Sequence, residues 1–387
     1  MLEHEPDFER LLKAIRFEEP DRVPLQDSVT AGIKSKLLGH PVVGPADEIE
    51  FQVKFGYDYV AAAPDVDFEL GKDDPNLTRA DIHTGQPRKW ANQHVGIISS
   101  WKDFEQHPWP EASDVSYRLI EEYGRLIPDG MKVWGHRGHI FTEVWKLMGL
   151  ETFCYAIYDR QDLVDAMFEK IGALVYEMVE TMLDMDFVGA IRHNDDLGWS
   201  ESTLVPPWVY RRWQFPWMRK IVDLCHEKGR PFIFHCDGNV MQVWDDLLEL
   251  GIDAFHPVEP KAMDIREVRE ITKGKIALMG NVPQTFPLTF GSPADVRLHV
   301  AKLIRDVAPG GGYVLGSGHS VQDYVPPENF IAMVEAALEY GRYPIDIPQA
   351  EIRRLEAEAE ASPKNYDVDL SGAETATMSS YEEQLIT

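Results

Sequence analysis

The stretch Pro231-Phe-Ile-Phe-His-Cys-Asp-Gly-Asn239 decides how the rest of the chain is interpreted. Residues 232–235 combine aromatic and β-branched side chains between two turn signals, which predicts a short buried strand. The Asp-Gly-Asn that follows is typical of a turn. Because residues two apart in a strand point the same way, His235 and Asp237 share a face and Cys236 points to the other. The pattern indicates two metal ligands or an acid/base pair, and the plain alternative is a core histidine before an Asp-Gly turn.

The composition sets broad limits on the class of protein. The chain has 387 residues, of which 44% are hydrophobic, and this is enough for a large folded core. Its formal net charge of −27 disfavours nucleic acid and anionic membrane surfaces as partners. No apolar run is long enough for a membrane helix, and the start of the chain lacks the apolar region of a signal peptide. The three cysteines are widely spaced and form no disulfide framework, so we expect a cytoplasmic protein.

Eight stretches are candidate strands, and most are separated by segments with helical periodicity. The candidate strands are residues 22–27, 57–64, 132–139, 187–196, 232–235, 252–259, 275–281 and 313–319. Parallel strands joined by helices form an α/β sheet, and eight of them predict a closed (β/α)8 TIM barrel. An open doubly wound sheet is the alternative, but the Gly-rich dinucleotide fingerprint is missing after the first strand.

Two regions depart from this repeating pattern. Residues 66–110 hold many turn residues and mixed polar segments, which predicts an inserted hairpin and loop region. Residues 351–387 are rich in Glu, Ser, Ala and Thr and poor in large apolar side chains. We therefore expect a barrel domain over residues 1–345 and an acidic C-terminal tail or arm over residues 346–387.

Polar side chains gather at the predicted strand exits, where the loops of a TIM barrel build its site. The exits carry Asp27, Asp65, His136, His139, His193, Asp195, Asp196, His235, Cys236, Asp237, His256, Glu259, Asn281 and His319. Six of the 13 histidines are among them. A general preference of His and Asp for turns accounts for some of these positions but not for the whole set, so we expect the functional site here.

Two histidines and a carboxylate with open positions are a common arrangement for a catalytic metal. A set without thiolates is chemically hard, and it suits Zn²⁺ without excluding Mn²⁺ or Fe²⁺. A metal held this way can polarise a substrate or lower the pKa of a bound water, thiol or alcohol. The residues alone do not decide between metal binding and plain acid/base chemistry.

Several motifs together resemble the uroporphyrinogen decarboxylase superfamily. They are RFEEPDRVPL (16–25), FHCDGN (234–239), GIDAFHPVEP (251–260), KIALMGNV (275–282), APGGGYVLGSGHS (308–320) and VPPENFIAMVEA (325–336). The resemblance covers residues 7–344 and keeps the order of the motifs. It implies a (β/α)8 barrel. The superfamily includes cofactor-free decarboxylases and zinc-dependent methyltransferases that move methyl groups between corrinoid proteins and small thiols.

The resemblance to the methyltransferase branch implies a set of metal ligands. That branch has a His-x-Cys-Gly-Asn motif on its fifth strand and a second Cys shortly before a helix that begins like PPEN. Here the His falls on His235, the first Cys position on Asp237, and the second on His319. Both thiolates are replaced by residues that still bind metals, so His235, Asp237 and His319 are the implied ligands of Zn²⁺ or another divalent metal. The decarboxylase branch grips its substrate with an Arg-rich motif, where this chain has Arg22 alone.

We therefore predict a metal-dependent methyltransferase that acts on a small molecule, a methyl ether or a thiol. A separate corrinoid protein is the expected methyl carrier, and a homodimer is included among the expected assemblies. The expected catalytic residues, which hold or protonate the substrate, are Asp196, Asp195 and Glu143. The expected substrate-binding residues are His193, His136, His256 and Glu259.

Two alternatives stay open. One is a metal-free decarboxylase or lyase of a small carboxylic acid, with His235 and His319 as proton donors and Asp196 as an electrostatic partner. The other is a non-catalytic binding subunit that keeps the barrel. Metal analysis of the purified protein separates the three hypotheses.

Overall fold

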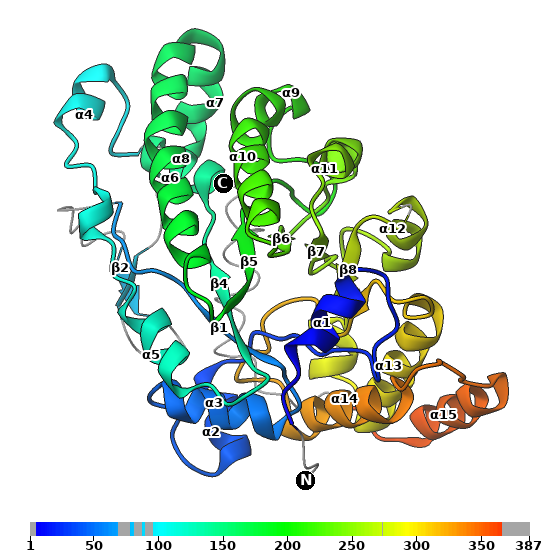
Figure 1. Ribbon diagram of the computed structural model, residues 1–387. Helices are drawn as coiled ribbons and strands as arrows, with labels where there is room; N and C mark the ends of the chain where they lie inside the picture. The colour runs from blue at the N-terminus through cyan, green and yellow to red at the C-terminus, as the bar shows by residue number, and fades with distance from the viewer. Residues whose placement is uncertain (1–4, 69–77, 81–86, 90–95, 273, 366–387) are drawn as a thin grey trace.

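The centre of the computed structural model, which describes residues 5–68, 78–80, 87–89, 96–272 and 274–365, is a parallel β-sheet (Figure 1). Its seven strands pair in the order β1-β4-β5-β6-β7-β8-β9, each parallel to its neighbours. The strands are β1 (Tyr59–Ala62), β4 (Lys132–His136), β5 (Val188–Asn194), β6 (Phe232–His235), β7 (Ala254–His256), β8 (Ala277–Met279) and β9 (Tyr313–Val314). Parallel neighbours require crossover connections, and this confirms the α/β class.

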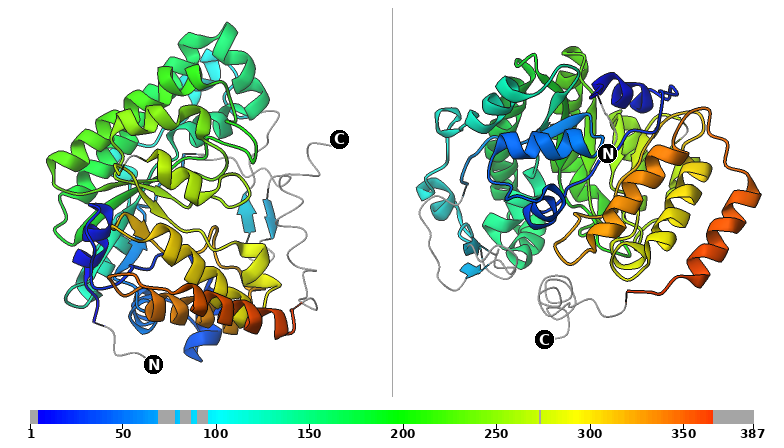
Figure 2. Two further views of the ribbon diagram at one scale, coloured as in Figure 1. Left: turned by 90° about the vertical axis from the view of Figure 1, so that its right-hand side faces the viewer. Right: turned by 90° about the horizontal axis from the view of Figure 1, so that it is seen from below.

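Helices make these crossovers and surround the strands in the views of Figures 1 and 2. The α-helices are α1 (Phe8–Ile15), α2 (Ala31–Leu38), α3 (Pro45–Lys54), α4 (Trp101–Gln106), α5 (Arg118–Leu126), α6 (Ile140–Met148), α7 (Leu150–Asp159), α8 (Gln161–Leu183), α9 (Pro207–Val209), α10 (Phe215–Glu227), α11 (Trp244–Leu250), α12 (Ile265–Ile271), α13 (Pro293–Val307), α14 (Pro327–Tyr340) and α15 (Gln349–Ala361). Short 3₁₀ or π turns are η1 (Ala112–Asp114), η2 (Tyr210–Gln214), η3 (Met241–Val243) and η4 (Gln284–Thr289).

The first expected strand, residues 22–27, forms only isolated bridges instead of a full strand. Leu25 pairs in parallel with Leu315, which follows β9. The Gln26 N–H donates to the Leu315 carbonyl at 2.9 Å, and the Leu315 N–H donates to the Pro24 carbonyl at 2.9 Å. Proline has no N–H to donate, so this stretch cannot continue a regular ladder. It nevertheless lies alongside β9 and delivers Gln26 to the carboxyl end of the sheet.

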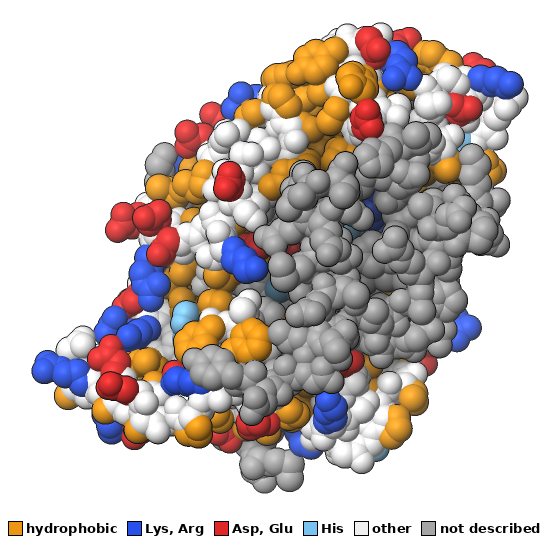
Figure 3. All heavy atoms as spheres, turned by 180° about the vertical axis from the view of Figure 1, so that it is seen from behind, with side chains coloured by type: hydrophobic (Ala, Val, Ile, Leu, Met, Phe, Trp, Pro, Cys, Tyr) orange, Lys and Arg blue, Asp and Glu red, His pale blue; other side chains and the backbone are white. Residues whose placement is uncertain are grey.

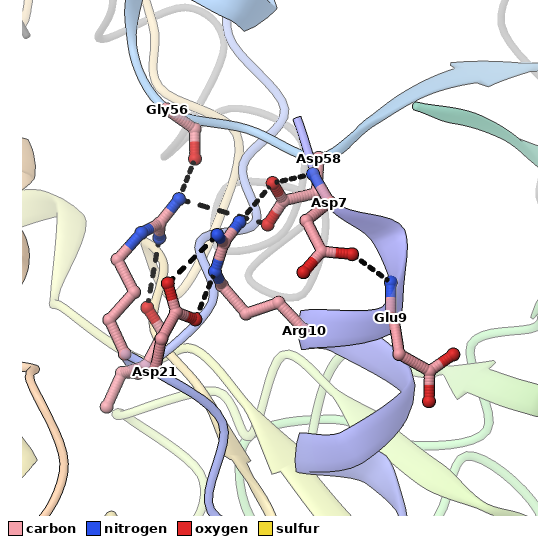
Figure 4. A network of polar contacts seen from close by, with 8 residues as sticks. Asp7, Glu9, Arg10, Asp21, Gly56 and Asp58 are labelled. Carbon is pink, nitrogen blue, oxygen red and sulfur yellow. Dashed lines mark hydrogen bonds and ion pairs between the residues drawn. The ribbon is translucent and has the colours of Figure 1, made fainter. Parts of the chain in front are cut away.

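A buried ion network fixes α1 beneath the start of β1 (Figure 4). The Arg10 guanidinium lies 2.5 Å from a carboxylate oxygen of Asp58 and 2.6 Å from one of Asp21. Asp58 is 1% exposed and immediately precedes β1. Arg22 belongs to the same network, because its Nη2 donates to the Gly56 carbonyl at 2.9 Å. These arginines are therefore held by the chain itself.

The two irregular regions are partly described. Within residues 66–110, β2 (Thr78–Ala80) and β3 (Pro87–Lys89) form an antiparallel pair. The rest of the expected hairpin at 69–77, 81–86 and 90–95 lies outside the described residues, as does the tail from 366 to 387.

The helix α15 opens the C-terminal region and packs against α13 (Figure 2, right). Its Ile352 and Leu355 side chains are buried. Beyond the helix, Lys364 forms an ion pair with Asp295 of α13 at 2.6 Å. The first part of the acidic region is thus an ordered arm on the helical layer. Among the described residues, no helix has the length and apolar character needed to cross a membrane.

Candidate functional site

The loops after β5 and β6 bring together two carboxylates and an imidazole at the carboxyl end of the sheet. Asp196 follows β5, His235 is the last residue of β6, and Asp237 lies two positions further. Each side chain offers a ligand atom, and these atoms all lie within 4.8 Å of one another. The Asp237 N–H also donates to Asp196 Oδ1 at 3.0 Å, which ties the two loops. We call this group the Asp196–His235–Asp237 cluster.

Two glycines allow these loops to approach each other. Gly238 has a φ of +84°, and a Cβ there would lie 2.3 Å from the Gly198 carbonyl oxygen. A Cβ on Gly198 would in turn lie 2.7 Å from the Asn239 carbonyl oxygen. The Asn239 N–H donates to the Trp199 carbonyl at 2.6 Å across the same contact. Larger residues would separate the loops that carry Asp196 and Asp237.

A chain of hydrogen bonds fixes the protonation of His235. The His256 Nε2 lies 2.7 Å from Gln26 Oε1, and the His256 Nδ1 lies 2.6 Å from the His235 Nδ1. An amide oxygen only accepts, so His256 carries its proton on Nε2 and accepts at Nδ1 from His235. Burial holds the pKa of both histidines well below the usual range, so both are neutral. The charges of His256 and Arg192 add to this effect at His235, and that of Arg192 adds to it at His256. His235 Nε2 therefore keeps its lone pair, as a metal ligand requires.

The charge balance of the cluster favours a cation. Burial raises the pKa of Asp237 well above its usual range, and the charges of Asp196 and Glu259 add to the effect. Burial also raises the pKa of Asp196, against the opposing hydrogen bond from the Asp237 N–H. Asp237 Oδ1 is buried without a hydrogen-bond partner among the described residues. An orphaned carboxylate oxygen beside a second carboxylate and a neutral imidazole fits a divalent metal with N/O preference.

Cys236 faces away from this cluster. Its side chain is buried, and Sγ accepts the Leu197 N–H at 3.2 Å and donates to the Asp237 carbonyl at 3.2 Å. Burial raises the pKa of the Cys236 thiol well above its usual range. Because the thiolate is the metal-binding form, Asp237 is the better ligand of the two.

His193 and Asp195 lie on the opposite side of β5. His193 is fully buried, with its ring centroid 5.5 Å from that of Phe232. Asp195 accepts hydrogen bonds from the Phe141 and Thr142 N–H groups at 2.8 Å each, which caps the start of α6. Burial raises the pKa of Asp195 to about 7. The structure thus places these two expected site residues as supports behind the strand.

The remaining predicted residues lie outside the cluster. His319 is exposed and lies outside the group of mutually close ligand atoms, although its charge still acts on Asp196. Glu259 accepts the Gly238 N–H at 2.8 Å and so holds the loop after β6. Glu143 lies in the first turn of α6, where its charge acts on Arg137. His256 lies beside His235 on the neighbouring strand and accepts a hydrogen bond from it.

His136 sits next to Arg192 on the inner face of the sheet. The two are register partners on β4 and β5, and Arg192 Nη2 lies 3.3 Å from His136 Nδ1. Arg192 and Gln26 are site residues that sequence reasoning missed. A charged side chain inside a strand of buried residues was the available signal for Arg192, since such a charge needs a partner. Gln26 gave no comparable signal.

Comparison with known proteins adds a family match. A family model described as Uroporphyrinogen decarboxylase (URO-D) matches residues 97–340. The chain is 28% identical over 139 residues to the uroporphyrinogen decarboxylase of Dichelobacter nodosus, covering 35% of this chain and 38% of the relative. It is 35% identical over 132 residues to that of Nitrosomonas europaea, covering 33% and 36%. The match thus spans little more than a third of the length of these relatives.

One solved structure is similar over most of its length. A methyltransferase from Methanosarcina mazei superposes with a TM-score of 0.64 at 18% sequence identity, covering 87% of this chain and 99% of that chain. At this identity the likeness concerns the fold.

Proposed function

We propose that this chain, which belongs to the uroporphyrinogen decarboxylase (URO-D) family, is a metal-dependent methyltransferase acting on a small molecule. The observation that carries the proposal is the Asp196–His235–Asp237 cluster, whose ligand atoms lie within 4.8 Å of one another. The shared fold with a methanogen methyltransferase supports it. We also propose that residues 22–27 take the place of the eighth strand of a TIM barrel, because Leu25 pairs in parallel with Leu315.

The proposed metal is Zn²⁺ or another divalent ion, held by His235 Nε2 and by carboxylate oxygens of Asp237 and Asp196. His319 was the third ligand implied by resemblance, and Asp196 takes that place in this proposal because it belongs to the group of mutually close ligand atoms. When bound, such an ion supplies Lewis-acid chemistry, which makes an ether oxygen a better leaving group or a thiol a better nucleophile.

The side chains around the cluster keep it in place. Gln26 and His256 hold His235 in the tautomer that presents Nε2, through contacts of 2.7 and 2.6 Å. Glu259 fixes the loop after β6 at the Gly238 N–H. A ligand set fixed this way needs little reorganisation when the substrate binds.

The corrinoid carrier belongs to the proposal as a partner protein, and no residue of this chain is assigned to it. Lys, Arg, Asp and Glu side chains are interspersed over the described part of the face drawn in Figure 3, so we assign no docking surface. A homodimer and a cytoplasmic location remain predictions.

Metal analysis with matched variants tests the proposal. The purified protein should contain about one divalent metal per chain, by the single ligand cluster described, and Asp237→Asn should lose it. Asp246→Asn is the control, because Asp246 pairs with Arg211 at 2.8 Å and is not a member of the ligand cluster. Methyl transfer from small methyl ethers to free cob(I)alamin, and from methylcobalamin to small thiols, should depend on the metal. Full metal content in Asp237→Asn would contradict the assignment.

A metal-free decarboxylase of a small acid is the second candidate. Its supporting observation is the same carboxylate pair, because a raised pKa in Asp237 lets the pair retain a proton that could be delivered to a carbanion. Turnover of a carboxylic acid by protein freed of metal would favour this candidate. A chain with neither metal nor turnover would instead be a binding subunit.

A further inference from the structure

Two buried hydrogen-bond donors on the inner face of β4 and β5 have no acceptor in the part of the chain that the structure describes. Arg192 Nε and His136 Nε2 are both buried and without a partner among the described residues. Arg192 Nη2 donates to His136 Nδ1 at 3.3 Å, so the His136 proton resides on Nε2. Burial, reinforced by the charge of Arg192, holds the pKa of His136 well below its usual range. The pair thus presents the guanidinium Nε–H and a neutral imidazole N–H, and neither has an acceptor among the described residues.

The Arg192 guanidinium also has no ion-pair partner among the described residues, unlike the buried arginines Arg10 and Arg22. Arg10 lies 2.5 Å from Asp58, and Arg22 lies 3.9 Å from the same carboxylate (Figure 4). Within the described chain, no carboxylate oxygen lies within the 4.0 Å ion-pair distance of Arg192. The guanidinium also lies over the Trp134 ring, whose centroid is 5.6 Å from Cζ. A desolvated guanidinium without a counterion is costly, so an anion is expected to bind there.

This pair faces the same side of the sheet as the ligand cluster. Arg192 and Asn194 alternate with His193 along β5, so both point inward, and Asn194 is the register partner of His235. The charge of Arg192 acts on His235 and His256, and the charge of Asp237 acts on Arg192. The inner face therefore has a basic side at β4–β5 and an acidic side at the exits of β5 and β6.

We propose that Arg192 and His136 form a carboxylate subsite, and that the substrate of this protein carries a carboxylate bound there while its reacting heteroatom faces the Asp196–His235–Asp237 cluster. The carboxylate subsite is inferred from the two donors alone, whereas the position of the reacting heteroatom rests on the proposed function. A guanidinium binds a planar carboxylate through two parallel N–H bonds, and the imidazole N–H supplies a third donor. Arg22 cannot serve this purpose, because it is engaged by Gly56 and Asp58.

The test uses benzoate and its uncharged isostere benzamide as probes, with binding measured by calorimetry on the protein as purified. Benzoate should bind and benzamide should bind at least tenfold more weakly. Arg192→Gln should weaken benzoate binding by about tenfold to a hundredfold, the range for a lost hydrogen bond to a charged group. Arg211→Gln, which removes an exposed arginine paired with Asp246, should leave it unchanged.

Further variants separate the two proposals. Asp237→Asn should retain benzoate binding even where it loses metal, whereas benzoate bound to the metal would be lost. Arg192→Lys keeps the charge without the planar fork, should weaken benzoate less than Arg192→Gln, and serves if the latter does not fold. Equal binding of benzoate and benzamide, unchanged binding in the Arg192 variants, or no binding to the wild type would overturn the subsite. None of these results depends on methyl transfer.

Discussion

Replacing Gln26 by leucine removes the acceptor that sets the protonation of the two histidines. His256 Nε2 donates to Gln26 Oε1 at 2.7 Å, and His235 Nδ1 donates to His256 Nδ1 at 2.6 Å. In Gln26→Leu, His256 either keeps a buried N–H without an acceptor or moves its proton to Nδ1. The second choice forces His235 to carry its proton on Nε2, where it blocks metal binding.

Either choice weakens the metal site. Loss of an outer partner of a metal-binding histidine typically reduces metal affinity by about 10- to 100-fold, or about 1.4–2.7 kcal/mol. The unpaired N–H would lower the free energy of unfolding by about 1–3 kcal/mol. Metal affinity is measured by competition with a chromophoric zinc chelator, and stability by urea unfolding followed by circular dichroism.

Two variants control this experiment. Gln52→Leu removes another buried glutamine, whose Nε2 donates to Glu48 at 3.0 Å within α3, and it should cost stability without affecting metal affinity. Gln26→Glu retains an acceptor for His256 and should keep metal affinity near that of the wild type. If Gln26→Leu binds metal as tightly as the wild type, the hydrogen-bond chain does not set the tautomer and the reasoning fails.

Three further perturbations address the loops, the core and the C-terminal arm. Gly238→Ala strains a residue at φ +84° and pushes against the Gly198 carbonyl, so it should lose at least about 1–2 kcal/mol of stability and reduce metal content in elemental analysis. Burial raises the pKa of Asp27 to about 6 from 3.8, so the folded state favours the protonated carboxyl. The resulting gain in the free energy of unfolding is fully present below pH 4 and is lost as the pH rises through 6. Urea unfolding from pH 4 to 7 should therefore show the difference between wild type and Asp27→Asn changing by about 3 kcal/mol, and parallel curves would contradict this. Leu355→Ala should cost about 2–5 kcal/mol because Leu355 of α15 is fully buried, while a value near zero would mean that the arm packs loosely.

The periodic elements of the fold follow directly from the sequence. The stretch 232–235 forms the strand β6 with the expected bounds, and the polar residues expected at strand exits do lie at one end of the sheet. The stretch 22–27 shows the limit, because apolar alternation there predicts a strand while Pro24 interrupts the ladder. The helix α6 was not predicted, although its Ile140, Val144 and Leu147 side chains form a buried stripe at helical spacing.

Only part of the site could be predicted from the sequence, because packing determines which side of the sheet a side chain faces and how deeply it is buried. His235 and Asp237 were chosen by the alternation of a strand, and the structure brings them together. The same alternation, applied to His193, indicates that its side chain faces away from that of His235. The sequence does not show how residues 187–196 align with residues 232–235, so this difference was not predicted. Asp195 was predicted to be catalytic beside Asp196, but the two follow β5 and point to opposite sides: Asp195 caps α6 and Asp196 joins the cluster. Gln26 and His256 meet across 230 positions, which no local pattern reveals.

A crystal structure measured on both sides of the X-ray absorption edge of the bound metal would test the proposed metal site. We predict one anomalous peak at the carboxyl end of the sheet, bonded by His235 Nε2 and by carboxylate oxygens of Asp237 and Asp196. No peak between these side chains after soaking in Zn²⁺, or a peak held by other residues, would contradict it. A peak that includes His319 in place of Asp196 would keep the metal and correct the ligand set.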